Sequence, residues 1–248
     1  MFHILYGIIE NIEQHNPNMK KNITNILKKD KDIKKVIFKD LGLISYNDAY
    51  ALQISLFDQI KLENRLGIVL LLEHYPVITI GSNRKLDNLL VTTKILEKQK
   101  IQLVQSTRGG DITFHGPGQI ICYPILNLSY IKKDLSLYVY NLEQVIIEVL
   151  ETFKIDGVRK KKHRGIFVMD NKIASIGIRI RKWITLHGFS LNVNINLKYF
   201  DNIIACGLKD FTQTSMQKIL NKTIQTDDVK EQIIYHFSKV FNLPVSKI

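Results

Sequence analysis

Residues 108–119 read Arg-Gly-Gly-Asp-Ile-Thr-Phe-His-Gly-Pro-Gly-Gln and form the densest cluster of special residues in the chain. Four glycines permit a close approach of backbone to ligand, and Arg108, Thr113 and His115 supply donors beside them. The stretch is not a phosphate-binding loop, because the Lys-Ser/Thr ending is absent. It is not a dinucleotide fingerprint, because Ile121 stands where a third glycine belongs. A tight inter-strand loop is the plain alternative, but the donors gathered around four glycines favour a ligand site.

Apolar segments on both sides of this stretch predict a mixture of strands and helices. Short apolar runs predict buried strands at 67–73, 77–80, 101–106, 119–126 and 188–193, and a hairpin turning at 170–171 joins strands at 165–169 and 172–180. Helices are predicted at 46–64, 135–153 and 227–241, the first from the capping-box signal of Ser45 and Asp48. Strict βαβ alternation is absent. The predicted fold class is therefore α/β of the α+β type, a single domain with a mixed β-sheet and packed helices.

The composition is that of an ordinary globular protein. Of the 248 residues, 45% are hydrophobic and 23% charged, which excludes wholesale disorder, collagen and coiled coil. The longest apolar runs, such as 67–72, are too short to span a bilayer. We therefore expect no membrane partner. Two cysteines cannot form a disulfide scaffold, so we expect a reducing, cytoplasmic location.

The chain is predicted to divide into an extension and one domain. Residues 1–35 become polar and rich in Asn and Lys after a short apolar start, so we expect this N-terminal extension to be poorly ordered. Neither a linker nor a repeat divides residues 36–248.

Basic residues concentrate in one segment of the chain. The net charge is +12, and residues 154–182 contain ten basic and two acidic residues, a local excess of +8. Such an excess suggests an acidic partner, although the Lys-, Asn- and Ile-rich composition also fits an AT-rich genome. The segment is therefore either a solvated loop or a docking surface.

Four ordered motifs resemble those of the lipoyl(octanoyl) transferases, which share a fold superfamily with the lipoate and biotin protein ligases. They are residues 108–119, Lys-Ile-Ala-Ser-Ile-Gly at 172–177, Thr-Leu-His-Gly-Phe-Ser-Leu-Asn-Val at 185–193 and Cys-Gly at 206–207, with a weaker match at 74–81. The resemblance covers residues 36–248 and implies that they form an octanoyltransferase catalytic domain, with the fold of the biotin/lipoate protein ligase catalytic domain.

The resemblance also implies an activity and its partners. The enzyme would transfer octanoyl, or lipoyl, from acyl carrier protein to a specific lysine of lipoyl domains through a cysteine thioester, the first step of endogenous protein lipoylation. The expected acceptors are the lipoyl domains of 2-oxoacid dehydrogenases and the glycine cleavage H protein. Because converting a thioester to an amide is downhill, we expect no ATP and no cofactor. We also expect a monomer and no nucleic-acid partner.

Two residues are implied as catalytic, Cys206 as the nucleophile and Lys172 as its partner. A free thiol has a pKa of about 8.5, so a nucleophilic cysteine needs a nearby cation or base. Lys172 opens an apolar strand, where its ammonium could be held against the sheet. The other cysteine, Cys122, stands in an apolar run and fits a buried structural role. The family usually has a proline before the nucleophile; Ala205 stands here, which puts the rigidity of the cysteine turn in question.

The remaining site residues implied by the resemblance line the acyl pocket, with His187 as a further pocket residue. They are Arg108, Gly109, Gly110, Asp111, Ile112, Thr113, Phe114, His115, Ser175, Ile176, Gly177, Gly188, Phe189 and Ser190. Three histidines, His74, His115 and His187, could in principle converge on a metal. None of them shows the spacing of a metal motif, so no metal site is predicted.

Two other functions stay open at this point. An ATP-dependent lipoate or biotin protein ligase of the same fold would adenylate a free acid, and it would need ATP and Mg²⁺ but no nucleophilic cysteine. A nonenzymatic nucleic-acid binder would account for the basic charge. It would leave the glycine-rich stretch unexplained, and the sequence has no recognisable binding module.

Overall fold

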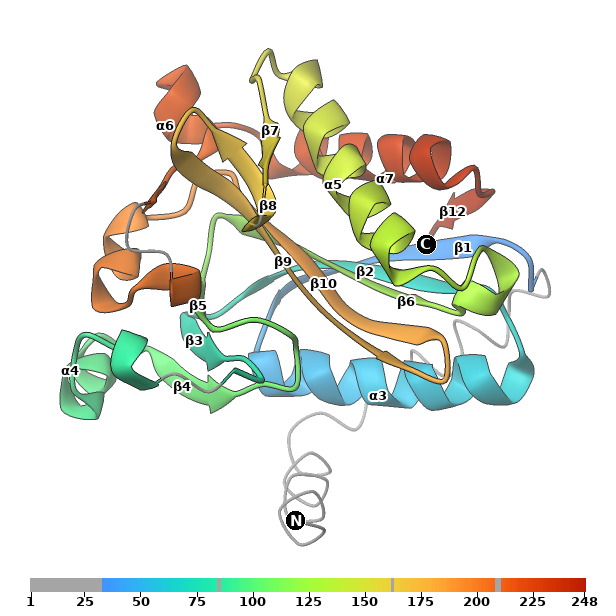
Figure 1. The fold of residues 1–248 in the computed structure, drawn as a ribbon, viewed down its shortest axis with the longest axis horizontal. Helices are drawn as coiled ribbons and strands as arrows, with labels where there is room; N and C mark the ends of the chain where they lie inside the picture. Colours follow the sequence, from blue (N-terminus) through green and yellow to red (C-terminus); the bar gives the residue numbers. More distant parts are fainter. Residues whose placement is uncertain (1–32, 84–85, 162, 208–210) are drawn as a thin grey trace, which may run out of the picture.

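A mixed β-sheet runs through the middle of the molecule (Figure 1). The computed structural model describes residues 33–83, 86–161, 163–207 and 211–248, and within them nine strands follow the order β12-β1-β2-β6-β10-β9-β8-β7, with β11 paired to β9. The strands are β1 (Val36–Ile44), β2 (Gly67–His74), β6 (Gln119–Leu126), β7 (Val158–Lys160), β8 (His163–Val168), β9 (Asn171–Arg181), β10 (Ile184–Asn192), β11 (Thr212–Gln213) and β12 (Val245–Lys247). β1 pairs in parallel with β2 and β12, whereas β2, β6, β10, β9 and β8 pair antiparallel in turn.

Helices cover both faces of this sheet. Helices α5 (Leu135–Thr152) and α7 (Thr226–Phe241) pack on one face, and α3 (Tyr46–Glu63) packs on the other (Figure 1). Side chains alternate along β6, so that Ile120 and Cys122 join the core beneath α5 while Ile121 and Tyr123 join the core beneath α3. A strand buried on both faces reads as a continuous apolar run, which explains why β6 has the predicted bounds.

The helix ends follow from their capping residues. The Ser45 hydroxyl accepts a hydrogen bond from the backbone N–H of Asp48 at 3.1 Å, so α3 begins where the capping signal predicts. Asp134 caps α5 in the same way by accepting from the Leu137 N–H at 2.9 Å. Two acidic residues, Asp227 and Asp228, lie in the first turn of α7, where the helix dipole favours negative charge.

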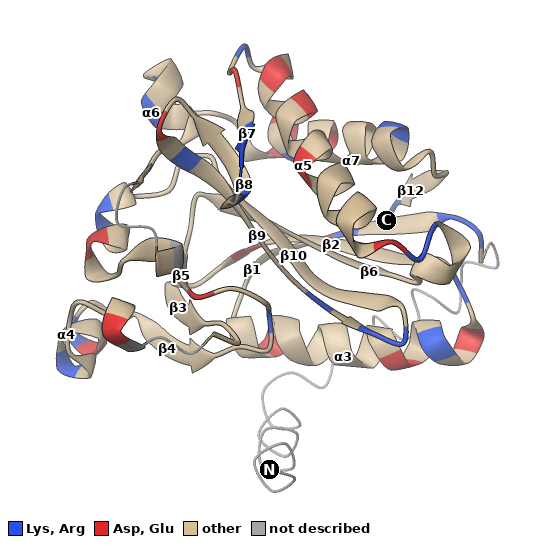
Figure 2. Cartoon of the chain, in the orientation of Figure 1, with Lys and Arg blue, Asp and Glu red and all other residues tan. Residues whose placement is uncertain are grey.

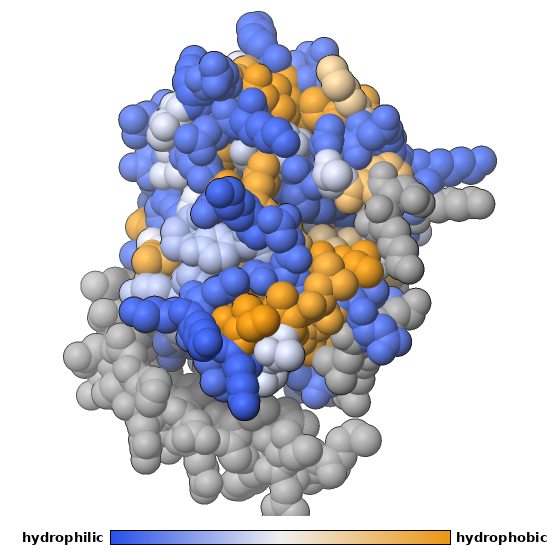
Figure 3. Space-filling view, turned by 90° about the vertical axis from the view of Figure 1, so that its left-hand side faces the viewer, coloured by the Kyte–Doolittle hydropathy of each residue, from blue (hydrophilic) through white to orange (hydrophobic). Residues whose placement is uncertain are grey.

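A second, three-stranded sheet lies beside the first and carries one wall of the site. Strand β3 (Val77–Ile80) is its centre, flanked in parallel by β4 (Gln102–Gln105) and antiparallel by β5 (Ile112–His115). Ile78, Phe114 and Ile203 share its small core. The shorter helices are α4 (Thr93–Lys98), α6 (Met216–Leu220) and the 3₁₀ turns η1 (Leu86–Asn88), η2 (Leu128–Tyr130), η3 (Leu197–Asn202) and η4 (Ala205–Gly207). Figure 3 shows the side of the molecule that lies on the left in Figure 1, where apolar residues are exposed among hydrophilic ones.

The predicted fold class is confirmed, and the differences lie in β1 and in several short strands. Residues 108–119 are not one loop, because 112–115 form β5 between two glycine-rich turns. Strands β1, β7, β11 and β12 were not predicted either; the last three have two or three residues each, too few to show a period of two. The expected disorder of the extension concerns residues 1–32, which lie outside the described residues. In the described part of the chain, every helix is too short or too polar to cross a membrane.

Candidate active site

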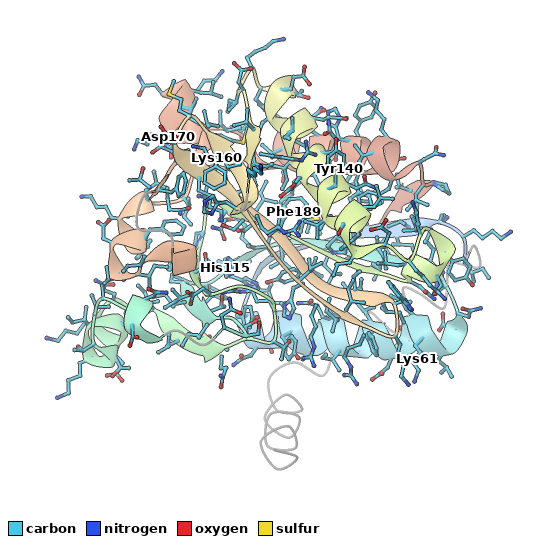
Figure 4. The ribbon with its side chains drawn as sticks, in the orientation of Figure 1. Lys61, His115, Tyr140, Lys160, Asp170 and Phe189 are labelled. Atoms are coloured by element: carbon cyan, nitrogen blue, oxygen red, sulfur yellow. The ribbon has the colours of Figure 1, made fainter. Side chains whose placement is uncertain are left out.

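A cavity of about 450 Å³ opens where the small sheet meets β9 and β10. It gathers most of the residues predicted for the acyl site, although they come from three distant parts of the chain. Those that line it are Arg108, Gly109, Gly110, Asp111, Thr113, His115, Lys172, Ser175, Ile176, Gly177, Gly188, Phe189 and Ser190, together with Gly207 and the predicted pocket residue His187. In Figure 4, His115 approaches from the small sheet and Phe189 from β10.

Two of the predicted acyl-site residues do not line the cavity. Ile112 and Phe114 are fully buried in the core of the small sheet. Both positions follow from the alternation along β5, which turns Thr113 and His115 toward the cavity and Ile112 and Phe114 away from it. The motif therefore lines the cavity continuously at 108–111 and with alternate side chains in β5.

Several cavity residues were not predicted from the sequence. Ile121 and Tyr123 come from β6, Leu135 and Val139 from the first turns of α5, and Ile178 from β9. All five read as ordinary core positions in the sequence, and only the fold shows that they border a hollow. They give the cavity an apolar wall.

A pair of glycines lets the strands and the loop come together at this cavity. Gly177 and Gly188 lie opposite each other in β9 and β10. A Cβ on Gly188 would stand 2.1 Å from the Cys122 carbonyl oxygen, so a side chain there would force β10 away from β6. A Cβ on Gly177 would stand 3.1 Å from the Gly109 carbonyl oxygen. This close approach lets the Gly109 N–H bond to the Ile178 carbonyl at 3.0 Å.

Arg108 fixes the glycine-rich loop to the small sheet. Its guanidinium donates to the Thr79 carbonyl at 2.7 Å and to the Thr79 hydroxyl at 2.9 and 3.1 Å. A further bond reaches the Gly109 carbonyl at 3.1 Å. Only 8% of the Arg108 surface is exposed, so these hydrogen bonds are largely buried and hold the loop against the small sheet.

Three histidines around the cavity are buried and held neutral. Burial lowers the pKa of His74 to about 4, and burial together with nearby cationic and imidazole groups lowers the pKa values of His115 and His187 to about 3. Each ring has a hydrogen-bond partner: His74 the Tyr123 hydroxyl at 2.9 Å, His115 the Gln119 amide oxygen at 2.7 Å and His187 the Thr107 hydroxyl at 3.0 Å. Among the described residues, no group of three histidine, cysteine or acidic side chains is placed to hold a metal ion.

These pKa shifts predict that the fold loses stability in mild acid. Between pH 6.5 and about 4, the unfolded chain takes up protons on these histidines that the folded protein does not, so the free energy of unfolding falls as the pH falls. At pH 5 each buried histidine should cost about 2 kcal/mol relative to pH 8. Urea unfolding across this range measures the slope, and His74→Gln should reduce it by about 1.4 kcal/mol per pH unit. An identical slope in the variant would contradict the assignment to His74.

Lys172 is buried near the start of β9, the arrangement that the sequence had left open. Only 3% of its surface is exposed, and its ammonium lies 5.5 Å from the centre of the Phe167 ring. Gly165 makes room for the lysine side chain, because a Cβ there would stand 3.0 Å from Lys172 Cε. Pairing of β11 with β9 and a bond from the Thr214 N–H to the Lys172 carbonyl at 2.9 Å fix the backbone. The lysine is therefore positioned by the sheet instead of extending into solvent.

The Cys206 turn is held without the usual proline. Cys206 lies in η4; its side chain is outside the described part of the structure. The Ile204 N–H donates to the Asn88 carbonyl at 2.8 Å, and the Gly207 N–H donates to the Ile204 carbonyl at 3.0 Å. Ala205 packs into the core of the small sheet. Backbone hydrogen bonds and packing thus hold the turn where proline would restrict it.

Cys122 has the environment of an inert core residue. It is fully buried between β2 and β10, opposite Leu71 and Phe189. Burial raises the pKa of its thiol well above the ordinary range, so it stays protonated.

Comparison with known proteins places this fold in the class of lipoyl protein ligase catalytic domains. The model of the lipoyl protein ligase A/B catalytic domain matches residues 45–238. A structure titled lipoate-protein ligase A bound with ATP aligns with a TM-score of 0.66 over 86% of this chain and 88% of its own, at 14% identity. A bipartite lipoate protein ligase from Thermoplasma acidophilum gives a TM-score of 0.65 over 86% and 87%, at 16% identity. At these identities the structures establish the fold.

Curated relatives narrow the class further. A protein named octanoyltransferase from Thermoanaerobacter sp. (strain X514) is 46% identical over 210 residues, which cover 84% of this chain and 91% of that protein. Another octanoyltransferase, from Caldicellulosiruptor saccharolyticus, is 43% identical over 81% and 86% of the two chains. The chain belongs to the octanoyltransferases of the lipoyl protein ligase A/B catalytic domain family. It is an acyltransferase that transfers octanoyl groups in protein lipoylation, and the ligase alternative is not favoured.

Proposed function

We propose that the enzyme works by double displacement, with Cys206 carrying the octanoyl group between an acyl carrier protein and a lipoyl domain. The observation that supports this most is the cavity, which joins an apolar wall to a buried lysine and the cysteine-bearing turn. The catalytic domain is assigned to residues 36–248. The acceptors are the lipoyl domains of 2-oxoacid dehydrogenases and the glycine cleavage H protein.

In the first step the Cys206 thiolate attacks the carbonyl carbon of the donor thioester. A new carbon–sulfur bond forms to Cys206, the bond to the carrier sulfur breaks, and the Lys172 ammonium gives its proton to the departing carrier thiolate. The products are the octanoyl-enzyme, a neutral Lys172 and the carrier thiol. The position of Lys172 supports this role, because the side chain is buried and lines the cavity instead of extending into solvent.

In the second step the acceptor lysine attacks the enzyme thioester. A carbon–nitrogen bond forms, the bond to the Cys206 sulfur breaks, and neutral Lys172 takes one proton from the acceptor ammonium. The second proton lost by that nitrogen leaves to solvent. The thiolate and the Lys172 ammonium are restored, so the enzyme returns to its starting protonation state after each turnover.

The octanoyl chain is assigned to the apolar wall. Ile176, Phe189, Ile121 and Val139 line one continuous cavity with the residues of the glycine-rich loop. Burying a methylene contributes about 0.8 kcal/mol, so the alkyl chain of the octanoyl group supplies most of the affinity for the acyl group. The predicted acyl-site residues at 108–111, 113, 115, 175–177 and 188–190 are proposed to hold it.

Intact mass measurement tests this proposal directly. The protein mixed with octanoyl-acyl carrier protein in the absence of ATP should gain the mass of one octanoyl group, and hydroxylamine should remove it. A ligase would instead require free acid and ATP, and it would give no covalent adduct under these conditions. Absence of the adduct from active enzyme overturns the double displacement.

The basic stretch is proposed to dock the carrier protein, although part of its charge is engaged within the fold. Basic positions of β7 lie near acidic positions of α5 (Figure 2), and Arg159 bonds to Glu143 of α5 at 3.1 Å. Lys160 pairs with Asp170 (Figure 4). Lys161 and Arg164 are exposed, and Arg164 borders the cavity. Lys162 lies outside the described residues. The free part of the +8 excess is therefore smaller than the sequence count suggests, and Arg164 brings one exposed cation of the stretch to the cavity.

Reversing the charge of Lys161 should weaken the use of the carrier-bound substrate. Charges at the rim of an interface steer association and are screened by salt. We expect Lys161→Glu to raise the KM for octanoyl-acyl carrier protein severalfold at low salt, with little change for octanoyl-pantetheine, which has no protein surface. Lys61→Glu, far away on α3 (Figure 4), is the matched control. Equal losses with both substrates contradict docking.

A further inference from the structure

Asp111 is a buried carboxylate that faces the cavity, and its hydrogen-bond partners among the described residues are neutral. It is 8% exposed, and its Oδ1 accepts from the Ile112 N–H at 2.8 Å while its Oδ2 accepts from the Asn88 amide at 2.6 Å. Among the described residues, no lysine or arginine forms an ion pair with it. A buried charge of this kind is costly unless a cation accompanies it.

The carboxylate lies directly against the cysteine turn. A Cβ placed on Gly207 would stand 2.9 Å from Asp111 Oδ2 and 3.3 Å from the Asn88 amide nitrogen. Asn88 also accepts the Ile204 N–H through its carbonyl, so one residue positions both the carboxylate and the turn. Within the described part of the lining, the other charged groups are Arg108, Arg164 and Lys172, and Asp111 is the one carboxylate.

We propose that Asp111 binds the ammonium group of the acceptor lysine beside the octanoyl thioester, an inference that rests on the proposed role of Cys206. A lysine side chain has an ordinary pKa of about 10.4, so the acceptor arrives protonated. Counting only the described residues, each carboxylate oxygen of Asp111 accepts one hydrogen bond and can accept another. The first step leaves Lys172 neutral. The negative charge of Asp111 then favours the binding of a cation in the cavity beside the thioester.

The step remains balanced with Asp111 in place. Asp111 accepts a charge-assisted hydrogen bond from the ammonium but takes no proton, because a carboxylate is too weak a base for an amine. Neutral Lys172 removes one proton, the free amine attacks the thioester carbonyl, and the bond to the Cys206 sulfur breaks. The nitrogen loses its second proton to solvent, and Asp111 ends unchanged.

Deacylation of preloaded octanoyl-enzyme by two small nucleophiles tests the proposal. Ethylamine is an ammonium at pH 7.5, whereas hydroxylamine is neutral. Asp111→Asn keeps the shape of the side chain and removes its charge. We expect its rate constant with ethylamine to fall about tenfold or more, the effect of losing a hydrogen bond between charged groups. Its rate constant with hydroxylamine should stay within about twofold of the wild type.

Two further variants make the comparison specific. Asp87→Asn removes a carboxylate from an exposed position next to Asn88, and its two rate constants should match the wild type. Asp111→Glu keeps the charge on a longer side chain and should retain part of the preference for ethylamine. Because each variant is judged by the ratio of two rates on the same acyl-enzyme, the amount of folded protein cancels.

The possible outcomes separate the proposal from its foundation. Equal losses with both nucleophiles, or failure of Asp111→Asn to become acylated, would show that Asp111 only holds the turn and would overturn the ammonium site. Unchanged ethylamine rates would overturn it as well. If wild-type enzyme forms no octanoyl adduct, the double displacement itself fails, which is a different result.

Discussion

Replacing Cys206 with serine should abolish the octanoyl adduct and reduce transfer to background. An alcohol is ionised far less readily than a thiol, so the serine hydroxyl cannot form the nucleophile at neutral pH that a thiolate provides. The measurement is intact mass after incubation with octanoyl-acyl carrier protein, followed by hydroxylamine treatment. Transfer to a lipoyl domain is assayed on the same samples.

Cys122 provides the matched control for this experiment. Its thiol is buried in the core beneath α5, and burial raises its pKa well above the ordinary range. Cys122→Ala should keep both the adduct and the activity. Alanine is preferable to serine here, because a serine hydroxyl in an apolar core would lack a partner and cost about 1–3 kcal/mol. An adduct that persists in Cys206→Ser and disappears in Cys122→Ala would reverse the assignment.

Long, regular elements of the fold could be predicted because their signals are local. Ser45 caps α3 through a bond that lies within four residues of sequence, and β6 is a single apolar run bounded by turn residues. The short strand β5 could not be found in this way. Its four residues alternate between core and cavity, and the glycines on both sides conceal that alternation.

The candidate site could be predicted only as far as its motifs extend. The glycine-rich loop, Lys172 and the glycines of β9 and β10 are recognisable in sequence, and the fold brings them to one cavity. Asn88 gives no such signal. It is an unremarkable polar residue, and its role depends on lying between Asp111 and Ile204, which are distant in sequence. The apolar wall was missed for the opposite reason, because its residues are indistinguishable from core.

The salt bridges of the basic stretch illustrate a further limit of composition. Counting charges gives a local excess of +8, but the count cannot show which cations are neutralised by neighbours. Glu143, outside the stretch in sequence, bonds to Arg159 and also accepts the Gly165 N–H at 3.2 Å. The part of the excess that remains available to a partner is therefore a property of the fold.

Replacing Lys172 with arginine should separate the two steps of the reaction. Arginine keeps a positive charge at position 172 but stays protonated, so it cannot take a proton from the acceptor amine. We expect the variant to form octanoyl-enzyme, because a carrier thiolate with an ordinary pKa of about 8.5 can leave without the lysine proton and take one from water. Its second step should slow by about 10²–10⁴-fold, the usual contribution of a positioned base. Preloading the enzyme and following a single turnover with a lipoyl domain measures the second step alone.

Lys172→Met is the companion variant, because it fills the space beside Gly165 without charge or base. It should lose the thiolate reactivity as well as the second step, and alkylation of Cys206 by a small electrophile reports the former. Thermal unfolding should show both variants folded. The arginine variant keeps the positive charge, and for methionine an apolar side chain of similar volume is tolerated in place of a buried charge. Near-normal transfer by Lys172→Arg would exclude the base role, and the acceptor proton would then have to pass directly to water. Slow acylation in Lys172→Met together with fast acylation in Lys172→Arg would establish that the first step depends on positive charge and the second on a removable proton.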